Sequence, residues 1–418
     1  MTSAVEAVTN ALAEIERTEP LVKAWVHVDA AAAREQATGI DQHTSANQPL
    51  AGLTVGIKDI IDVAGMPTVA GFTPFADRIA TSDADVVQRL RTAGAVIIGK
   101  TTTTQFALAD PTPTRNPWNL DYSPAGSSSG SAAAVAAGHV DLALGSQTAG
   151  STLRPASFCG IVGFKPTFGW ASRTGMIPLA DSLDTVGLFA RDVMSIARLF
   201  DALADPDVER AGEIEPAAPP RIGFWEDAAS LATDEVHNLV DAALARAIQS
   251  GVSVEPVTSP ADYRDLLAIH HVIMLVDAAA AHEKLFQTHV NAYGPRIRMA
   301  IETGSAIAAH TYARAQLLRR EYRDQAVRDW SRVDVVALPT AETPAVPLDT
   351  TGSPALQAVV TMFGLPSISI PAGLSQDGLP VGLQLVATSP NGNASLLRVA
   401  AWFERLLDDL PTPPTAIR

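Results

Sequence analysis

Small side chains fill one stretch of this chain and limit the folds open to it. Between Gly126 and Gly138 a Gly/Ser-rich loop runs directly into a helix built mainly of alanine. Because such a helix carries little side-chain bulk, we expect residues 132–144 to pack closely against a sheet rather than to form a binding surface. Apolar strands are expected on either side of it, at 53–58 and 140–145.

Strand and helix patterns alternate along the chain. Helical spacing covers 3–17 and 83–93, with Gly94 as the C-cap of the second helix, and the region from about 232 to 330 is mainly helical. Further strand signals stand at 22–28, 95–99, 333–338, 367–370 and 381–386. This alternation predicts an α/β fold, a twisted mixed sheet covered by helices. The acidic, proline-containing segment 201–220 is expected to be a surface connection.

Composition argues against several kinds of partner. The chain of 418 residues has a formal net charge of −15, while 47% of its residues are hydrophobic and 18% are charged. A nucleic-acid-binding protein needs a basic stripe that neutralises phosphates, and an anionic membrane surface also attracts basic segments. We therefore expect neither nucleic acid nor a membrane as a partner, and we interpret the charge as a solvated acidic surface.

Cysteine usage and the N-terminus favour a cytoplasmic enzyme. The single cysteine, Cys159, cannot form an internal disulfide, which fits a reducing compartment. The first residues carry no early Lys or Arg and have helical rather than signal-peptide character. No apolar run reaches the ~18 residues that a membrane span needs.

A second glycine-flanked loop and a lysine supply candidate chemistry. Gly150 lets a substrate carbonyl approach Ser151 closely. Amide hydrolysis needs an activated nucleophile, a proton route to the leaving nitrogen and donors for the developing oxyanion. A second serine can relay the proton, and Lys58, in the apolar run 55–61, can be the base if burial lowers its pKa. Its one carboxylate neighbour in sequence is Asp59.

Several segments together resemble the amidase signature family. They are 123–131, 148–151, 158–167, 364–373 and 378–384. The resemblance extends over most of the chain except about 200–330. It implies the amidase-signature fold, with one amidase domain over 1–418, a core at about 50–195 and 330–390, and a variable helical region at about 200–330. A homodimer is also an expectation at the level of the family.

The resemblance assigns roles to matching positions. Ser151 takes the place of the nucleophile, Ser127 that of a bridging serine after a cis peptide bond, and Lys58 that of the general base. The family builds its oxyanion hole from backbone N–H groups, here those of Thr148, Ala149, Gly150 and Ser151. The implied mechanism is an acyl-enzyme on Ser151, released by water.

The sequence also departs from the family pattern. Alanine replaces the first glycine of the usual Gly-Gly pair at Ala125 and Ala149, and Thr361 replaces the usual asparagine before the closing Gly-Leu-Pro motif. Many members carry arginine two residues after the nucleophile, whereas here it stands three residues after it, at Arg154. Malonamidase, a member of the family, shares that placement and uses the arginine to hold a substrate carboxylate.

Arg154 therefore has two interpretations. Its planar guanidinium suits a substrate carboxylate, or it pairs with an interior carboxylate and stiffens the nucleophile loop. Ser128 and Ser129 are further candidates for substrate binding, or support the loop and the start of the helix through hydrogen bonds. We expect Cys159 to be a buried packing residue. The histidines lack zinc-ligand spacing, so we expect neither a metal site nor a cofactor.

The sequence predicts an amidase that acts on a small linear amide, and Arg154 favours one with a nearby carboxylate, such as a dicarboxylic acid monoamide. One alternative is a hydrolase of neutral aryl or alkyl amides or of carbamates, as in a urethanase. A second is the transamidation subunit of a tRNA-dependent amidotransferase, which needs partner subunits. A third is a non-catalytic binding protein on the same fold, against which the intact set of Lys58, Ser127 and Ser151 argues.

Overall fold

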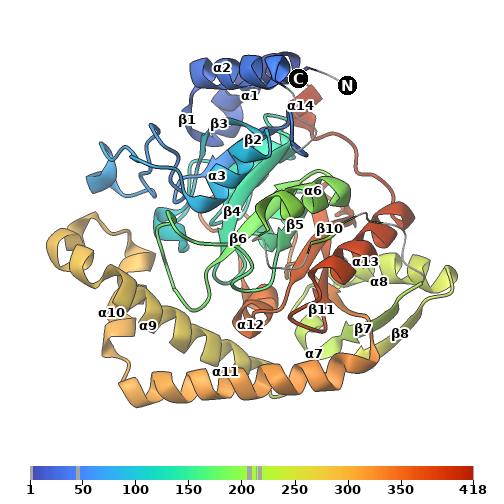
Figure 1. Ribbon diagram of the computed structural model, residues 1–418. Helices are drawn as coiled ribbons and strands as arrows, with labels where there is room; N and C mark the ends of the chain where they lie inside the picture. Colours follow the sequence, from blue (N-terminus) through green and yellow to red (C-terminus); the bar gives the residue numbers. More distant parts are fainter. Residues whose placement is uncertain (1–2, 44–47, 205–209, 213, 215–218, 418) are drawn as a thin grey trace.

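One large mixed sheet forms the centre of the molecule (Figure 1). The computed structural model describes residues 3–43, 48–204, 210–212, 214 and 219–417. In this part of the chain eleven strands pair in the order β1-β3-β2-β4-β6-β5-β10-β11-β9-β7-β8. The strands are β1 Trp25–Val28, β2 Thr54–Lys58, β3 Val96–Thr101, β4 Leu142–Gln147, β5 Val162–Lys165, β6 Thr185–Ala190, β7 Arg221–Trp225, β8 Ser253–Val257, β9 Val335–Pro339, β10 Ser367–Leu374 and β11 Pro380–Ala387.

Helices cover both faces of this sheet (Figure 1). They are α1 Ala4–Val22, α2 Ala30–Gln42, α3 Asp85–Thr92, α4 Ser129–Ala136, α5 Leu153–Cys159, α6 Val193–Leu203, α7 Glu226–Ala229, α8 Asp234–Gln249, α9 Tyr263–His289, α10 Pro295–Ala306, α11 Ala309–Asp329, α12 Ala355–Phe363, α13 Asn393–Leu406 and α14 Pro414–Ile417. Short 3₁₀ helices are η1 Thr73–Phe75, η2 Gln105–Ala107, η3 Val290–Ala292 and η4 Trp330–Arg332.

Alternation along the strands distributes apolar side chains to the two faces. In β4, Leu142 and Leu144 join the core cluster that contains α3, α6 and α13, whereas Ala143 joins the cluster that contains α1, α2 and α4. Successive side chains of a strand point to opposite faces, so both faces of the strand are buried. The small residues of α4 are fully buried against β4 and its neighbours, as the alanine-rich pattern predicts. The predicted α/β fold with a mixed sheet and two helical layers is confirmed.

Two strands of the sheet lie in the variable helical region expected at about 200–330. They are β7 and β8, which pair in parallel, and β8 forms one edge of the sheet. β8 carries Glu255 and Pro256, and both are exposed, as is Ser253. Proline and charge are tolerated at an edge strand, and they also weaken the strand pattern in the sequence. The expected surface connection at 201–220 lies in part outside the described residues.

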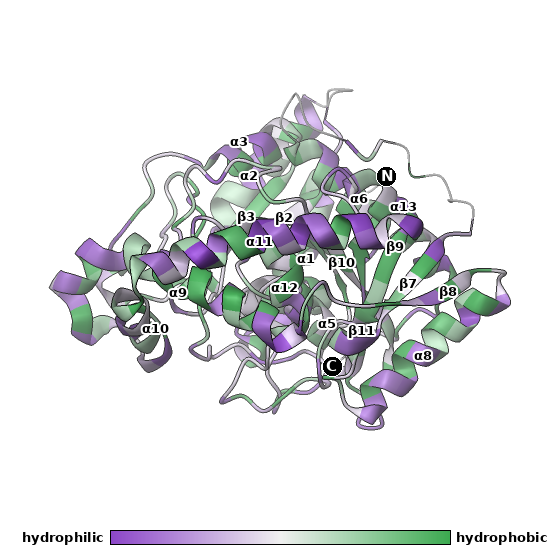
Figure 2. Cartoon of the chain, turned by 90° about the horizontal axis from the view of Figure 1, so that it is seen from below, coloured by the Kyte–Doolittle hydropathy of each residue, from purple (hydrophilic) through white to green (hydrophobic). Residues whose placement is uncertain are grey.

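Helices α9, α10 and α11 extend beyond the sheet at one side of the molecule (Figure 1). Figure 2 shows hydrophobic and hydrophilic residues interspersed along α11.

The sequence has no long apolar run, yet the segment Tyr263–Ala292 is long and apolar enough to cross a membrane by length and composition, with a mean hydropathy of 1.3. In its most apolar window 44% is buried, and α9 packs on α10, α11 and α12. A core helix has the same properties, so the observation is weak evidence for a span.

Candidate active site

Two neighbouring parallel strands bring the candidate residues to one edge of the sheet. β2 ends at Lys58 and β4 ends at Gln147, and Ile57 pairs with Leu144. The carboxyl ends of parallel strands meet at the same edge, where α/β proteins build their sites. Lys58 therefore lies beside the loop that carries Ser151.

Lys58 contacts two serine hydroxyls in the interior. Its Nζ lies 2.8 Å from Ser127 Oγ and 2.8 Å from Ser146 Oγ, and all three residues are buried. Burial lowers the pKa of Lys58 well below its usual value, and the charge of Asp184 opposes this effect. A neutral amine offers one lone pair, so Lys58 is suited to accept a proton from a hydroxyl. Ser146, which sequence reasoning missed, is the second hydroxyl that fixes this amine.

Asp59 forms an ion pair with a different buried lysine, Lys100. Its Oδ1 lies 3.2 Å from Lys100 Nζ, and its carboxylate accepts hydrogen bonds from the N–H groups of Val69 and Ala70. Lys100 also donates to Pro67 O and Thr68 Oγ1. Burial lowers the pKa of Lys100, but the charge and hydrogen bond of Asp59 oppose this effect, whereas the two hydroxyls beside Lys58 carry no charge. The structure thus separates a structural ion pair from the amine beside Ser127.

The loop before α4 contains the cis peptide bond that the family resemblance implies, between Gly126 and Ser127. Ala125 precedes it with φ of 63°, in the left-handed region that favours glycine. The hydroxyl of Ser128 donates to Ser146 O at 3.3 Å, and that of Ser129 donates to Ala125 O at 2.8 Å. Both hydroxyls thus support the loop, and neither residue is among those lining the cavity at Ser151, so their role in substrate binding stays a prediction.

Ser151 lies in the wall of a small cavity of about 80 Å³. The residues lining it include Ala107, Leu108, Thr148, Ala149, Gly150, Arg154, His270, His271 and Met274. Among the described residues, no protein group accepts a hydrogen bond from the N–H of Ala149, Gly150 or Ser151. Buried N–H groups in proteins normally have partners, so a row of free donors beside a hydroxyl is suited to an oxyanion.

The side chain of Gln147 holds the backbone that follows Ser151. Its Oε1 accepts hydrogen bonds from the N–H groups of Thr152 and Leu153, at 2.9 and 3.1 Å, where α5 begins. Side chains at 357 and 154 crowd the loop from the other side: a Cβ on Gly150 would lie 2.3 Å from Gln357 Oε1 and 3.2 Å from Arg154 Nη1. A side chain at position 150 would therefore displace Gln357, and the approach of a substrate carbonyl beside Gly150 stays a prediction.

Arg154 lies at the same cavity with most of its guanidinium unpaired. Its Nη2 donates to Gly126 O at 2.8 Å, while Nε and Nη1 are buried and have no hydrogen-bond partner. Burial lowers the pKa of Arg154 to about 10, and the charge of Glu342 opposes this shift. No salt bridge joins Arg154 to a carboxylate in the described part of the chain, so the predicted interior ion pair is absent there. A buried cation with free donors favours an anion as its partner.

Thr148, the first residue of the predicted oxyanion loop, is held by two buried side chains. Its hydroxyl donates to Asp184, whose carboxylate also accepts from the N–H groups of Leu179 and Ala180. His270 Nε2, from α9, lies 3.0 Å from Thr148 O. Sequence reasoning considered the adjacent pair His270 and His271 only as metal ligands, so it missed this contact.

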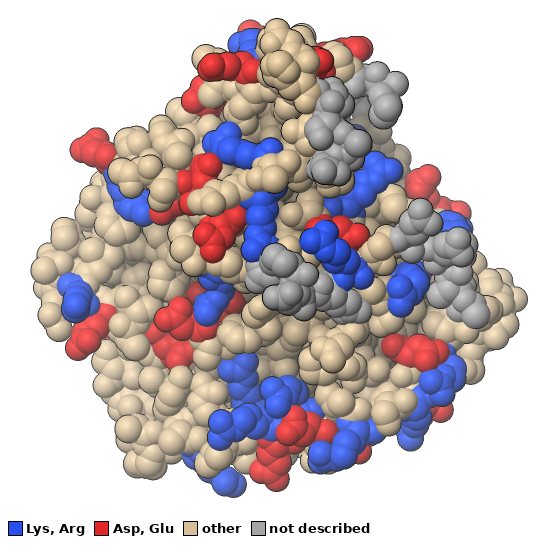
Figure 3. Space-filling model, in the orientation of Figure 1, with Lys and Arg blue, Asp and Glu red and all other residues tan. Residues whose placement is uncertain are grey.

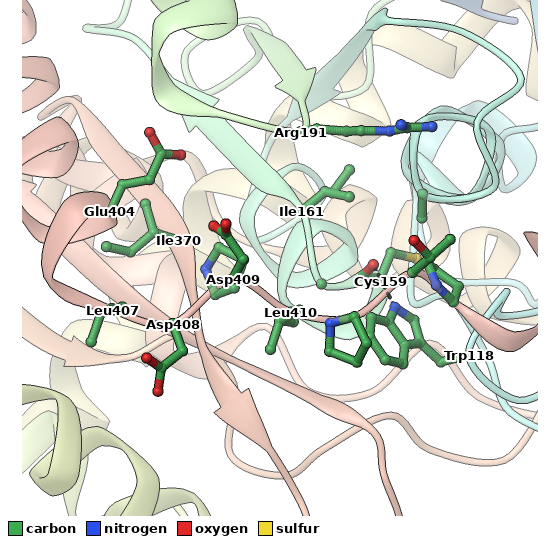
Figure 4. A pocket seen from close by; sticks show the side chains of 16 residues that line it. Trp118, Cys159, Ile161, Arg191, Ile370, Glu404, Leu407, Asp408, Asp409 and Leu410 are labelled. Carbon is green, nitrogen blue, oxygen red and sulfur yellow. Dashed lines mark hydrogen bonds between the residues drawn. The ribbon is translucent and has the colours of Figure 1, made fainter.

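A larger cavity of about 340 Å³ lies elsewhere, near the C-terminal segment (Figure 4). Its wall includes Glu404, Asp408, Asp409 and Cys159. Burial raises the pKa of Glu404 to about 7, and the carboxylate accepts a hydrogen bond from Val193 N at 2.8 Å. Cys159 is fully buried, as predicted, and burial raises the pKa of its thiol. The described residues hold no cluster of three or more metal-ligating side chains.

Comparison with known proteins places this chain in a family. The amidase family model matches residues 6–396. The A subunit of the glutamyl-tRNA(Gln) amidotransferase from Symbiobacterium thermophilum is 35% identical over 459 aligned positions, which cover 97% of this chain and 93% of that protein. Among solved structures, an amidase is 29% identical with a TM-score of 0.89 over 97% of both chains. Another, from a vestigial protein complex connected with the origins of an s-triazine catabolic enzyme, is 30% identical with a TM-score of 0.91, over 98% of this chain and 97% of that one.

The fold and the relatives define the class of protein as amidase-type C–N hydrolases. The chain belongs to the amidase signature family.

Proposed function

We propose that this protein hydrolyses the C–N bond of a small amide that carries a carboxylate. The observation that supports the substrate class is Arg154, whose Nε and Nη1 are buried and unpaired at the cavity of Ser151. An unsatisfied buried guanidinium is costly, and a substrate carboxylate supplies two acceptor oxygens for it. The cavity is small, about 80 Å³, which favours a compact acyl group.

In this proposal Ser151 is the nucleophile and Lys58 the base. The lone pair of neutral Lys58 accepts the proton of Ser127, whose oxygen in turn accepts the proton of Ser151 as Ser151 Oγ attacks the amide carbon. The N–H groups of Ala149, Gly150 and Ser151 donate to the resulting oxyanion. The C–N bond then breaks, the proton returns through Ser127 to the leaving nitrogen, and water releases the acid from Ser151.

Ammonia release from matched pairs of amides tests the substrate class. Malonamic and succinamic acids, asparagine and glutamine carry a carboxylate, while propionamide, benzamide and a methyl carbamate do not. We expect the carboxylate-bearing amides to react with the higher kcat/KM, and Ser151→Ala to remove turnover. The variant Arg154→Met also loses its contact with Gly126 O, so both kinds of amide should react more slowly. The fall in kcat/KM should be larger for the acids, since a charged hydrogen bond contributes about 1.5–3 kcal/mol. A preference for neutral amides in the wild type would refute the role of Arg154.

A second candidate function is that of the amidotransferase component that the curated relatives carry in their names. The observation that favours it is identity of 34–35% over nearly the full length of both chains. Glutamine is itself a carboxylate-bearing amide, so this function uses the same proposed site. Its partners would be the other subunits of the complex.

The surface charge bears on whether the protein binds tRNA, as this second function would require. Figure 3 shows Lys and Arg side chains at the face that α11 occupies in Figure 1, with Asp and Glu among them. The net charge of −15 disfavours strong binding to RNA, which needs positive charge to neutralise phosphates. Glutaminase activity that appears only with a co-purified partner would favour the amidotransferase, whereas full turnover of a free amide by the isolated chain would favour the hydrolase.

A further inference from the structure

Two helices outside the nucleophile loop hold the carbonyl oxygens of that loop. His270, on α9, places Nε2 3.0 Å from Thr148 O. Thr361, on α12, places Oγ1 2.7 Å from Ala149 O. Both side chains are buried, so water does not compete for these carbonyls. The loop is thus fixed at two successive peptide groups from two separate elements.

Each contact fixes the direction of an N–H group. A trans peptide is planar, and its C=O and N–H point in opposite directions. The peptide bonds after Thr148 and Ala149 are not among the cis bonds of the described chain. Holding Thr148 O therefore aims the N–H of Ala149, and holding Ala149 O aims the N–H of Gly150. These are two of the N–H groups without a protein acceptor at the cavity, within the part of the chain that the structure describes.

The protons on both side chains are defined by their partners. A carbonyl oxygen only accepts, so His270 carries its hydrogen on Nε2 and its ring is the donor. Burial lowers the pKa of His270 to about 4, which keeps the ring neutral.

The hydroxyl of Thr361 is engaged on both sides. It accepts a hydrogen bond from Gln147 Nε2 at 3.0 Å, so its own hydrogen is free to donate. Two carbonyls compete for that hydrogen, Ala149 O at 2.7 Å and Gln357 O at 2.9 Å. The helix already supplies Gln357 O with a donor, whereas Ala149 O lies in a loop.

We propose that His270 and Thr361 are positioning residues that aim the oxyanion-binding N–H groups of Ala149 and Gly150 at the reacting carbon. The inference rests on the proposed function, in which those N–H groups stabilise the oxyanion. Neither side chain needs to touch the substrate for this role. Loss of a complete oxyanion donor lowers kcat by about 10²–10³. Loss of the group that aims a donor leaves the donor present, so we expect about a tenfold fall in rate.

A substrate-independent reaction tests the inference. An alkyl fluorophosphonate reacts with an active serine: Ser151 Oγ forms a bond to phosphorus, fluoride leaves, and the serine proton passes through Ser127 to Lys58. The phosphoryl oxygen takes the position of the oxyanion, so the labelling rate depends on the N–H groups. Each positioning residue offers a matched pair of variants, Thr361→Val against Thr361→Ser and His270→Leu against His270→Gln.

We expect Thr361→Val and His270→Leu to slow labelling by about tenfold at every pH, with the midpoint of the pH–rate profile unchanged. Thr361→Ser and His270→Gln keep a donor and should stay within about threefold of the wild type. A general loosening of the site would also disturb the contacts of Lys58 and shift that midpoint. The near-ultraviolet circular dichroism of each variant checks that it is folded. Should a Val or Leu variant fail to fold, Thr361→Ala and His270→Asn replace them, since neither can reach the carbonyl.

Two results separate failure of this inference from failure of the proposed function. Labelling of folded Thr361→Val and His270→Leu within twofold of the wild type would overturn the positioning role, as would equal rates in the Val and Ser variants. Labelling of Ser151→Ala at the wild-type rate would instead overturn the proposed nucleophile.

Discussion

Replacing Ser146 with alanine changes the proton affinity of Lys58 in a direction that the structure defines. Lys58 Nζ has two hydroxyl partners at 2.8 Å, and Ser146→Ala removes one while leaving Ser127. A hydrogen bond to a charged group contributes about 1.5–3 kcal/mol and one to a neutral group about 0.5–1.5 kcal/mol. The lost bond therefore costs the ammonium about 1–1.5 kcal/mol more than the amine. Because one pKa unit corresponds to about 1.4 kcal/mol, the pKa of Lys58 falls further, by about one unit.

The sign of the effect on activity follows from the role proposed for Lys58. The base form is neutral, so the rate rises with pH through the pKa of Lys58 and then levels off. That pKa is already lowered by burial, and Ser146→Ala moves the midpoint of the profile to lower pH by about one unit. The plateau also falls, because the lone pair is no longer held toward Ser127.

The assay is kcat/KM for ammonia release, or the fluorophosphonate labelling rate, between pH 5 and 10. Ser146→Thr is the matched control, because it retains the hydroxyl and should keep the wild-type midpoint. A midpoint that stays in place or moves to higher pH in folded Ser146→Ala would refute the reasoning.

Three further outcomes follow from buried contacts. Lys100→Met leaves Asp59 without its cation and should lower the free energy of unfolding by about 3–5 kcal/mol. Adding Asp59→Asn removes the unpaired charge and should restore part of this loss. Chemical denaturation measures the free energy of unfolding of both variants. Gly150→Ala places a Cβ 2.3 Å from Gln357 Oε1, and the displaced buried side chain should disturb the loop and reduce turnover by up to about a hundredfold while circular dichroism stays native. The buried thiol of Cys159, with its raised pKa, should resist iodoacetamide in the native protein and react after unfolding; fast labelling of the folded chain would contradict its burial.

The resemblance to the amidase signature family implied that Lys58 and Ser127 lie together, and the structure shows their contact. Strand β2 ends at Lys58, and the Gly/Ser loop leads directly into α4, so each side chain is tied to a recognisable element. The partner of Asp59 was not predictable in the same way. Asp59 lies in the turn that follows β2, and its carboxylate meets Lys100 on β3 rather than the lysine beside it in sequence.

The remaining site residues depend on packing between distant segments. His270 meets Thr148 across 122 positions, and Thr361 meets Ala149 across 212. Neither contact could be predicted from the spacing of residues in the sequence. The positions of α9 and α12 relative to the loop depend on how these helices pack on the core. The exchange at Thr361 was visible in the sequence, but its effect needed the three-dimensional neighbours Gln147 and Ala149.

The position of His270 on α9 has a consequence for anyone who recombines this protein with its relatives. A chimera that exchanges residues 200–330 to alter substrate range also exchanges one of the two groups that hold the nucleophile loop. If His270 positions the loop as proposed, an exchange made to change selectivity also changes turnover, and the exchanged segment needs a hydrogen-bond donor at position 270.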